Sequence, residues 1–206
     1  MEQINFHFDP VCPWAWLTSR WALRLEELGE VKVDWRLFSL GIVHLENDQD
    51  PSEGPVGQSG PALQLLALAR REGGNSQVSR LYTAFGEAAH QRGEKLSDRS
   101  VLEAALTEAG MDPKRTSAAL EDRSLWLEVV SDHDAAVKSC QAFGVPTIVL
   151  DAGAGPGIFG PIITKVPSDR ECVDLLQDVV RLNRRDYVFE LKRDRDGHPP
   201  ELGRTA

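Results

Sequence analysis

The chain has 206 residues and a formal net charge of −9, with 41% hydrophobic and 27% charged residues. This length predicts one globular domain, or one domain with an insertion, that needs no disulfide or metal to build its core. The acidic charge argues against nucleic-acid binding, and without a polybasic segment or an apolar run of about 18 residues we expect no membrane contact.

The N-terminal forty residues predict a β-α-β unit. Residues 4–9 (INFHFD) alternate apolar and polar side chains, which is typical of a strand. A helix with Pro13 in its first turn and Gly29 at its end follows, because apolar residues recur there at every third or fourth position. Residues 31–39 (VKVDWRLFS) alternate again and predict a second strand.

A long helical region separates this unit from the remaining strands. Residues 41–60 are polar and rich in Asp, Gly and Pro, so they predict a long loop. Helical periodicity then runs through residues 61–72, 76–91, 98–110 and 112–144. Gly110 and Gly144 are expected to end the helices that precede them.

The C-terminal part predicts two strands and a helix. Residues 146–151 (PTIVLD) form a short apolar run expected in the centre of a sheet, and residues 155–161 (GPGIFGP) predict a turn and a short strand. Ser168 and Glu171 have the spacing of a capping box at the start of a final helix. Residues 192–206 are expected to form a solvated tail or a loose strap.

The order β-α-β, helices, β-β-α is typical of a thioredoxin-type sheet with an inserted helical domain. We therefore expect an α/β, thioredoxin-like fold. Residues 1–40 and 144–206 would form the thioredoxin-like domain, and residues 41–143 would form the all-helical insertion domain.

Cys12 lies where the first predicted strand ends and the first helix begins, in the stretch FDPVCPWAW. The free N–H groups and positive end of a helix stabilise a thiolate, so we expect the pKa of Cys12 to be lowered. Asp9 would oppose this if its carboxylate lay near the sulfur. The alternative is that Cys12 is only a small buried residue. Cys140 and Cys172 fall on apolar helix stripes and are expected to pack in the core.

The number of cysteines also bears on compartment and metal content. Three cysteines is an odd number, and the N-terminus has neither a basic start nor a long apolar run, so we expect a cytoplasmic protein without a disulfide framework. The five histidines have no metal-ligand spacing, so no metal site is expected.

Two motifs resemble the DsbA-like branch of the thioredoxin superfamily: CPW at residues 12–14 and GVPT at residues 144–147. The resemblance is closer still to the mycothiol-dependent nitroreductase subfamily, and it extends over nearly the whole chain. The segments that carry it lie in the subfamily's order at residues 8–21, 38–43, 88–93, 144–148, 159–167 and 189–193.

The resemblance implies that Cys12 is the attacking thiol and that Pro146 is a cis-proline facing it. The local sequence alone would favour a plain turn, because few X-Pro bonds are cis. Ala15 departs from the family, whose redox members carry a resolving cysteine at that position.

The resemblance also implies a substrate cleft between the sheet and the helical insertion. The residues expected to line it are Pro13, Trp14, Ala15, His44, His90, Val145, Pro146 and Thr147. Trp14 also begins the apolar stripe of its helix, and a histidine late in a helix often only caps its end, so structural roles stay open for both. Trp16 lies off that stripe and could face the cleft or a partner, whereas Arg20 and Arg24 are expected on the solvated face.

A single thiol at residue 12, without a second cysteine at residue 15, is compatible with three functions. The first is a monothiol oxidoreductase or transferase that uses mycothiol or glutathione as cosubstrate, with no tightly bound cofactor. The second is a cis–trans isomerase of conjugated polyene or acyl substrates that works by reversible thiolate addition. The third is a non-catalytic binding module. We expect a small-molecule substrate, free or presented on a carrier protein, and the sequence leaves a homodimer open.

Overall fold

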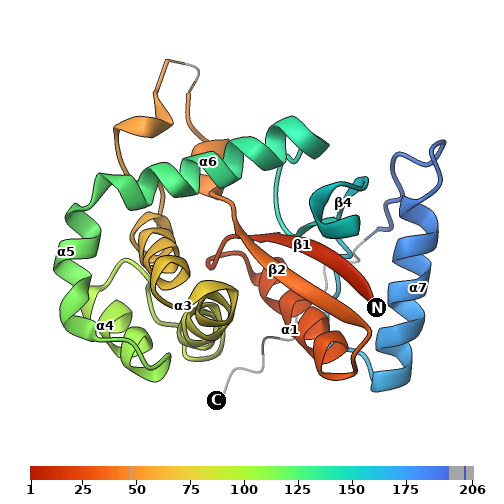
Figure 1. Ribbon diagram of the computed structural model, residues 1–206, viewed down its shortest axis with the longest axis horizontal. Helices are drawn as coiled ribbons and strands as arrows, with labels where there is room; N and C mark the ends of the chain where they lie inside the picture. Colours follow the sequence, from red (N-terminus) through yellow and green to blue (C-terminus); the bar gives the residue numbers. More distant parts are fainter. Residues whose placement is uncertain (47, 195–201, 203–206) are drawn as a thin grey trace.

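A four-stranded mixed sheet forms the centre of the computed structural model, which describes residues 1–46, 48–194 and 202 (Figure 1). The strand order is β2-β1-β3-β4; β1 runs parallel to β2, whereas β3 runs antiparallel to β1 and β4. The strands are β1 (Glu2–Phe8), β2 (Val31–Leu37), β3 (Thr147–Val149) and β4 (Gly157–Phe159). The N- and C-terminal parts of the chain therefore build one sheet.

The predicted β-α-β unit is confirmed. Helix α1 (Pro13–Glu27) joins the two parallel strands, and Gly29 follows its end with a φ of +75°. In β2 every second side chain is buried, whereas the last three residues of β1 are all buried, and the Phe6 and Trp35 rings lie 5.1 Å apart. This packing fixes the end of β1, and with it the segment that carries Cys12.

Helices fill the region between β2 and β3; in Figure 1, α3, α4 and α5 lie on the left and α6 runs across the top. They are α2 (Leu40–Val43), α3 (Gly60–Gly86), a π-helical segment (Glu87–Gln91), α4 (Arg99–Glu108), α5 (Thr116–Glu121) and α6 (Arg123–Cys140), with short 3-10 turns at Pro51–Glu53 and Pro113–Arg115. The element order confirms the predicted α/β arrangement with a helical insertion.

Three details of this region differ from the prediction. The two helices expected at 61–72 and 76–91 are joined through Gly74, whose φ of +65° interrupts the helical backbone. The predicted loop 41–60 contains the short helical turns given above. The expected stop at Gly144 is wrong, because α6 ends at Cys140 and Gln141 takes the left-handed conformation (φ 54°).

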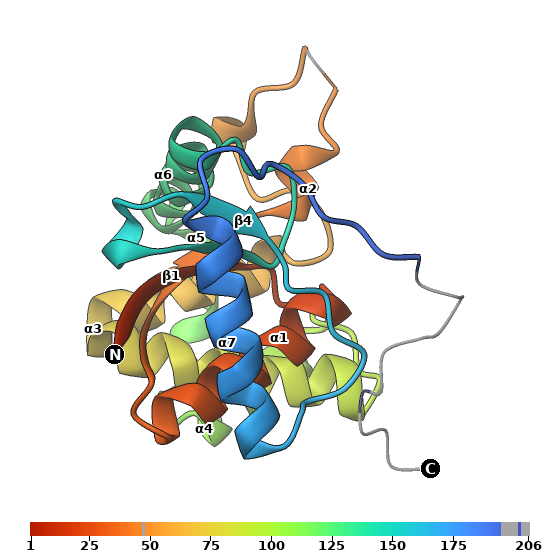
Figure 2. The same cartoon turned by 90° about the vertical axis from the view of Figure 1, so that its right-hand side faces the viewer.

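The C-terminal helix α7 (Asp169–Asn183) packs beside α1, as Figure 2 shows. Its predicted capping box is present between Ser168 and Glu171. The indole nitrogen of Trp21 donates to the Cys172 carbonyl at 3.1 Å and ties the two helices together. Of the predicted tail, residues 192–194 are exposed, and most of residues 195–206 lie outside the described chain.

Candidate active site

Cys12 is the N-cap residue of α1 and lies between that helix and the loop before β3. Its thiol donates to the carbonyl oxygen of Val145 at 3.5 Å, and its sulfur accepts the backbone N–H of Ala15 at the same distance. The Val145–Pro146 peptide bond is cis. The fold therefore brings Cys12 and Ala15 together with Val145, which is 133 positions after Cys12 in the chain. Pro13 lies in the first turn of α1.

The predicted direction of the Cys12 pKa shift is wrong for this structure. Burial raises the pKa of the thiol above its ordinary value, and the nearby Asp9 charge raises it further. The N–H groups of Ala15 and Trp14 act in the opposite direction, as expected at a helix N-terminus. Desolvation outweighs them because Cys12 is only 7% exposed, so the resting site holds a thiol rather than a thiolate at neutral pH.

Asp9 is a fully buried carboxylate beside the cysteine loop. It accepts hydrogen bonds from the backbone N–H of Val11 (3.1 Å) and Leu40 (2.8 Å) and from the hydroxyl of Ser59 (2.8 Å). Burial raises the pKa of Asp9 to about 6, although these three bonds favour the charged form. Asp9 therefore ties the cysteine loop to the start of α2 and to the N-terminus of α3.

His90 is buried in the π-helical segment and points toward the cysteine loop. Its Nε2 lies 2.9 Å from the Pro10 carbonyl oxygen. Because a carbonyl only accepts hydrogen bonds, Nε2 carries the proton. The ring also stacks on Trp16, with centroids 5.8 Å apart. His90 thus supports the backbone two residues before Cys12.

Trp16 and Arg20 do not take their expected places. Trp16 is buried against α3, where a Cβ on Gly86 would lie 2.0 Å from its ring. The Arg20 guanidinium lies 3.9 Å from the centre of that ring and donates to the Thr83 hydroxyl, and burial lowers the pKa of Arg20 to about 10. The insertion covers a face of α1 that the helical pattern left to solvent. Arg24 lies on the solvated face, as predicted, where it is partly exposed and pairs with Glu27 and Asp169.

The remaining predicted site residues do not all lie at the cysteine: Trp14 and Thr147 adjoin the Cys12 and Pro146 segments in the chain, whereas His44 belongs to another element. Trp14 is half-buried, and Thr147 is buried with its hydroxyl donating to the Gly144 carbonyl at 2.7 Å. His44 is exposed at the end of α2, and in the described chain no hydrogen bond or ring contact joins it to Cys12. Cys140 is half-buried and Cys172 is buried, and all three cysteines are free.

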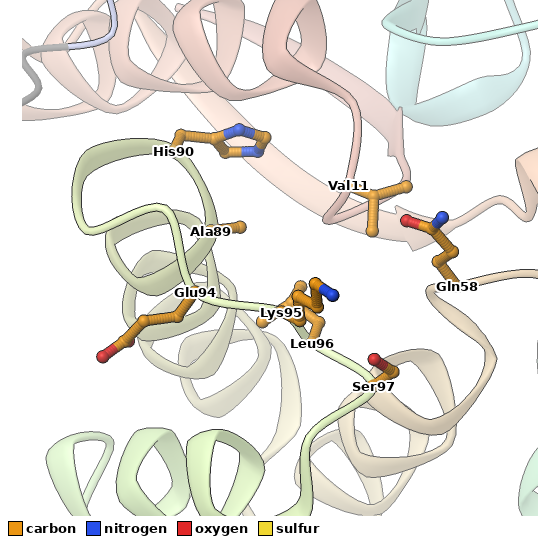
Figure 3. Close-up of a pocket in the computed structure, with 8 residues that line it drawn as sticks. All are labelled: Val11, Gln58, Ala89, His90, Glu94, Lys95, Leu96 and Ser97. Carbon is orange, nitrogen blue, oxygen red and sulfur yellow. The ribbon is translucent and has the colours of Figure 1, made fainter.

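A cavity of about 350 Å³ opens beside the cysteine loop (Figure 3). Val11 and Gln58 line one side, and His90 and residues 94–97 line the other. Gln58, Lys95 and Ser97 belong to no motif, so sequence reasoning missed them; their nearest signal is the family segment at 88–93. Within the described residues, no three metal-binding side chains cluster and no helix is long and apolar enough to cross a membrane.

Comparison with known proteins identifies a matching family and one curated relative. Residues 11–193 match the model of the Rv2466c-like family, described as mycothiol-dependent nitroreductase Rv2466c. The uncharacterized protein Rv2286c of Mycobacterium tuberculosis is 31% identical over 203 residues, which is 98% of this chain and 86% of that protein.

Solved structures share the fold at low identity. The cytosolic disulfide reductase DsbM from Pseudomonas aeruginosa superposes with a TM-score of 0.62 at 16% identity, covering 87% of this chain and 99% of DsbM, and DsbM is also solved with GSH. A 2-hydroxychromene-2-carboxylate isomerase superposes with a TM-score of 0.62 at 15% identity, covering 88% of this chain and 96% of the isomerase.

Proposed function

Because the chain belongs to the Rv2466c-like family of mycothiol-dependent nitroreductases, we propose that it is a thiol-dependent oxidoreductase in which Cys12 is the single reacting thiol. The observation that carries the proposal is the position of the Cys12 sulfur, which lies between the Ala15 N–H and the Val145 carbonyl. Ala15 cannot close a local disulfide, so a small thiol such as mycothiol or glutathione resolves the intermediate.

The reaction runs through a mixed disulfide. Cys12 loses its proton, and the thiolate attacks one sulfur of a small disulfide R′S–SR. The substrate S–S bond breaks, a new S–S bond joins Cys12 to SR, and R′S⁻ leaves and takes up a proton. A second thiol RSH, as its thiolate, attacks the SR sulfur and releases Cys12. In sum, R′SSR and RSH give R′SH and RSSR, so electrons and protons balance.

The chain supplies two elements of this reaction. The Ala15 and Trp14 amides stabilise the Cys12 thiolate each time it forms. The Val145 carbonyl accepts a hydrogen bond from the Cys12 thiol in the resting state, and this hydrogen bond must break before attack. A substrate that enters beside Cys12 displaces that bond as it binds.

The test is a mass measurement. We expect the purified protein, incubated with an oxidised small thiol at pH 7 to 8, to gain one adduct on Cys12 that free thiol removes. Cys12→Ser should gain none, and the matched variant Cys140→Ser should behave as wild type because its thiol is half-buried elsewhere. An unreactive Cys12 would contradict the proposal and favour a non-catalytic binding module.

The second candidate is a cis–trans isomerase, favoured by Ala15. Reversible addition of the Cys12 thiolate to an electron-poor alkene makes a single bond, rotation follows, and elimination returns the other isomer with the thiolate restored. This chemistry needs no second thiol and no net redox change. Full isomerisation by Cys12→Ser, or the absence of isomerisation of any conjugated substrate by the wild type, would exclude it.

A further inference from the structure

We propose that the cavity beside the cysteine loop binds the carboxylate end of a small molecule whose other end reacts at Cys12, and that Lys95 provides the opposite charge. The inference rests on the proposed function in that Cys12 is taken as the reacting thiol. It adds the chemical class of the ligand and the residues that select it.

The cavity has the size and place that such a ligand needs. Its volume of about 350 Å³ lies within the usual range of small-molecule sites. Val11 forms part of its wall and directly precedes Cys12, so the two Cα atoms are about 3.8 Å apart. Cys12 itself does not line the cavity, so in this proposal a molecule with its head in the cavity extends past Val11 toward the buried thiol.

The cavity carries positive charge in a protein of net charge −9. Figure 3 shows the Lys95 ammonium group on the side that faces Val11 and Gln58. Lys95 has no ion pair within the described chain. The neighbouring Glu94 carboxylate points away from the cavity and pairs with Arg92 at 2.9 Å. The Lys95 charge is thus available to a ligand.

Neutral donors accompany this charge. The Gln58 amide and the Ser97 hydroxyl line the cavity, and the described part of the chain offers neither side chain an internal hydrogen bond. One ammonium with two neutral donors balances the single charge of a carboxylate better than the charge of about −1.5 to −2 that a phosphate group carries at neutral pH. Val11, Ala89 and Leu96 add apolar parts to the wall, which suits a carboxylate on a short apolar body.

The carboxylate can belong to the thiol partner or to the other substrate, and the first experiment tests the thiol partner. Mass spectrometry would follow the rate of Cys12 adduct formation with glutathione disulfide, which carries carboxylates, and with bis(2-hydroxyethyl) disulfide, which carries none. We expect Lys95→Met to slow the first reaction about fivefold to tenfold, as for one charge pair near a surface, and to leave the second unchanged. Lys114→Met, an exposed lysine outside the cavity, is the matched control.

The second experiment tests the other substrate and does not depend on the reactivity of Cys12. Calorimetry would compare the binding of 4-nitrobenzoate with that of 4-nitrobenzamide to wild type and Lys95→Met. A preference for the carboxylate that depends on Lys95, in either experiment, supports the cavity assignment and identifies which of the two molecules carries the carboxylate. If Lys95→Met changes neither, the assignment is wrong. If neither disulfide modifies Cys12 in the wild type, the proposed function fails instead.

Discussion

Replacing Asp9 by Asn should change how the stability of the protein depends on pH. The pKa of Asp9 rises from 3.8 to about 6 on folding, mainly because burial penalises its charge. That difference corresponds to about 3 kcal/mol. The folded state holds the proton more tightly than the unfolded state, so this group costs nothing below about pH 4. Its penalty grows between about pH 4 and 6 and is constant above.

The Asp9→Asn variant loses this titration but also one hydrogen bond. Its amide oxygen can still accept from Leu40 and Ser59, whereas its NH₂ group would face the N–H of Val11. The loss of that bond costs about 1–3 kcal/mol at every pH. We therefore expect Asp9→Asn to be less stable than wild type at pH 4 and as stable or more stable at pH 7.

Urea unfolding followed by tryptophan fluorescence at pH 4, 5, 6 and 7 measures the effect. The free energy of unfolding of the variant minus that of wild type should increase by about 2.5 kcal/mol across this range, because a small part of the penalty is already present at pH 4. Asp98→Asn, an exposed carboxylate whose side chain makes no capping bond, should give a flat difference. A flat difference for Asp9→Asn as well would show that folding does not raise the pKa of Asp9.

Three further results are expected. Gly86→Ala should lower the free energy of unfolding by about 1–3 kcal/mol, because the new Cβ overlaps the Trp16 ring; an unchanged Tm would refute this packing. The rate of Cys12 alkylation by iodoacetamide should rise with pH to a midpoint above that of an ordinary thiol, because burial raises its pKa; a midpoint near 6 would contradict the buried resting site. His90→Phe should keep the ring stacking but leave the buried Pro10 carbonyl unpaired, costing about 1–3 kcal/mol in denaturant titrations, and an undisturbed unfolding curve would show that this bond contributes nothing.

The sequence predicted correctly those structural features that depend on residues close to one another in the chain. The alternation in β1 and β2, the Pro13 start of α1 and the Ser168 capping box depend on residues within a few positions of one another, and all are present. The same reasoning placed Cys12 at a helix N-terminus correctly. The effect of the helix N-terminus alone was also predicted correctly, since the Ala15 and Trp14 amides favour the thiolate and lower the pKa of Cys12.

The failures involve contacts between distant residues. The Cys12 pKa depends on burial beneath the loop of Val145, which is 133 positions away. Trp16 lies off the apolar stripe of α1 because that stripe describes only the face toward the sheet, whereas α3 covers a second face. The periodicity of the α1 sequence contains no information about the inserted helices that pack against α1. The cavity at Lys95 was not predicted for the same reason, since its walls come from three separate segments of the chain.

The position of β1 in the sheet has a consequence during synthesis. β1 is an interior strand, and its second neighbour, β3, begins at Thr147. At about 5–20 residues per second, the ribosome needs roughly 7 to 30 seconds to proceed from Cys12 to that strand. Throughout this interval the Val145 carbonyl and the loop that bury the thiol do not yet exist. The nascent chain therefore presents Cys12 to cellular oxidants and thiols before the protein acquires the site that controls it.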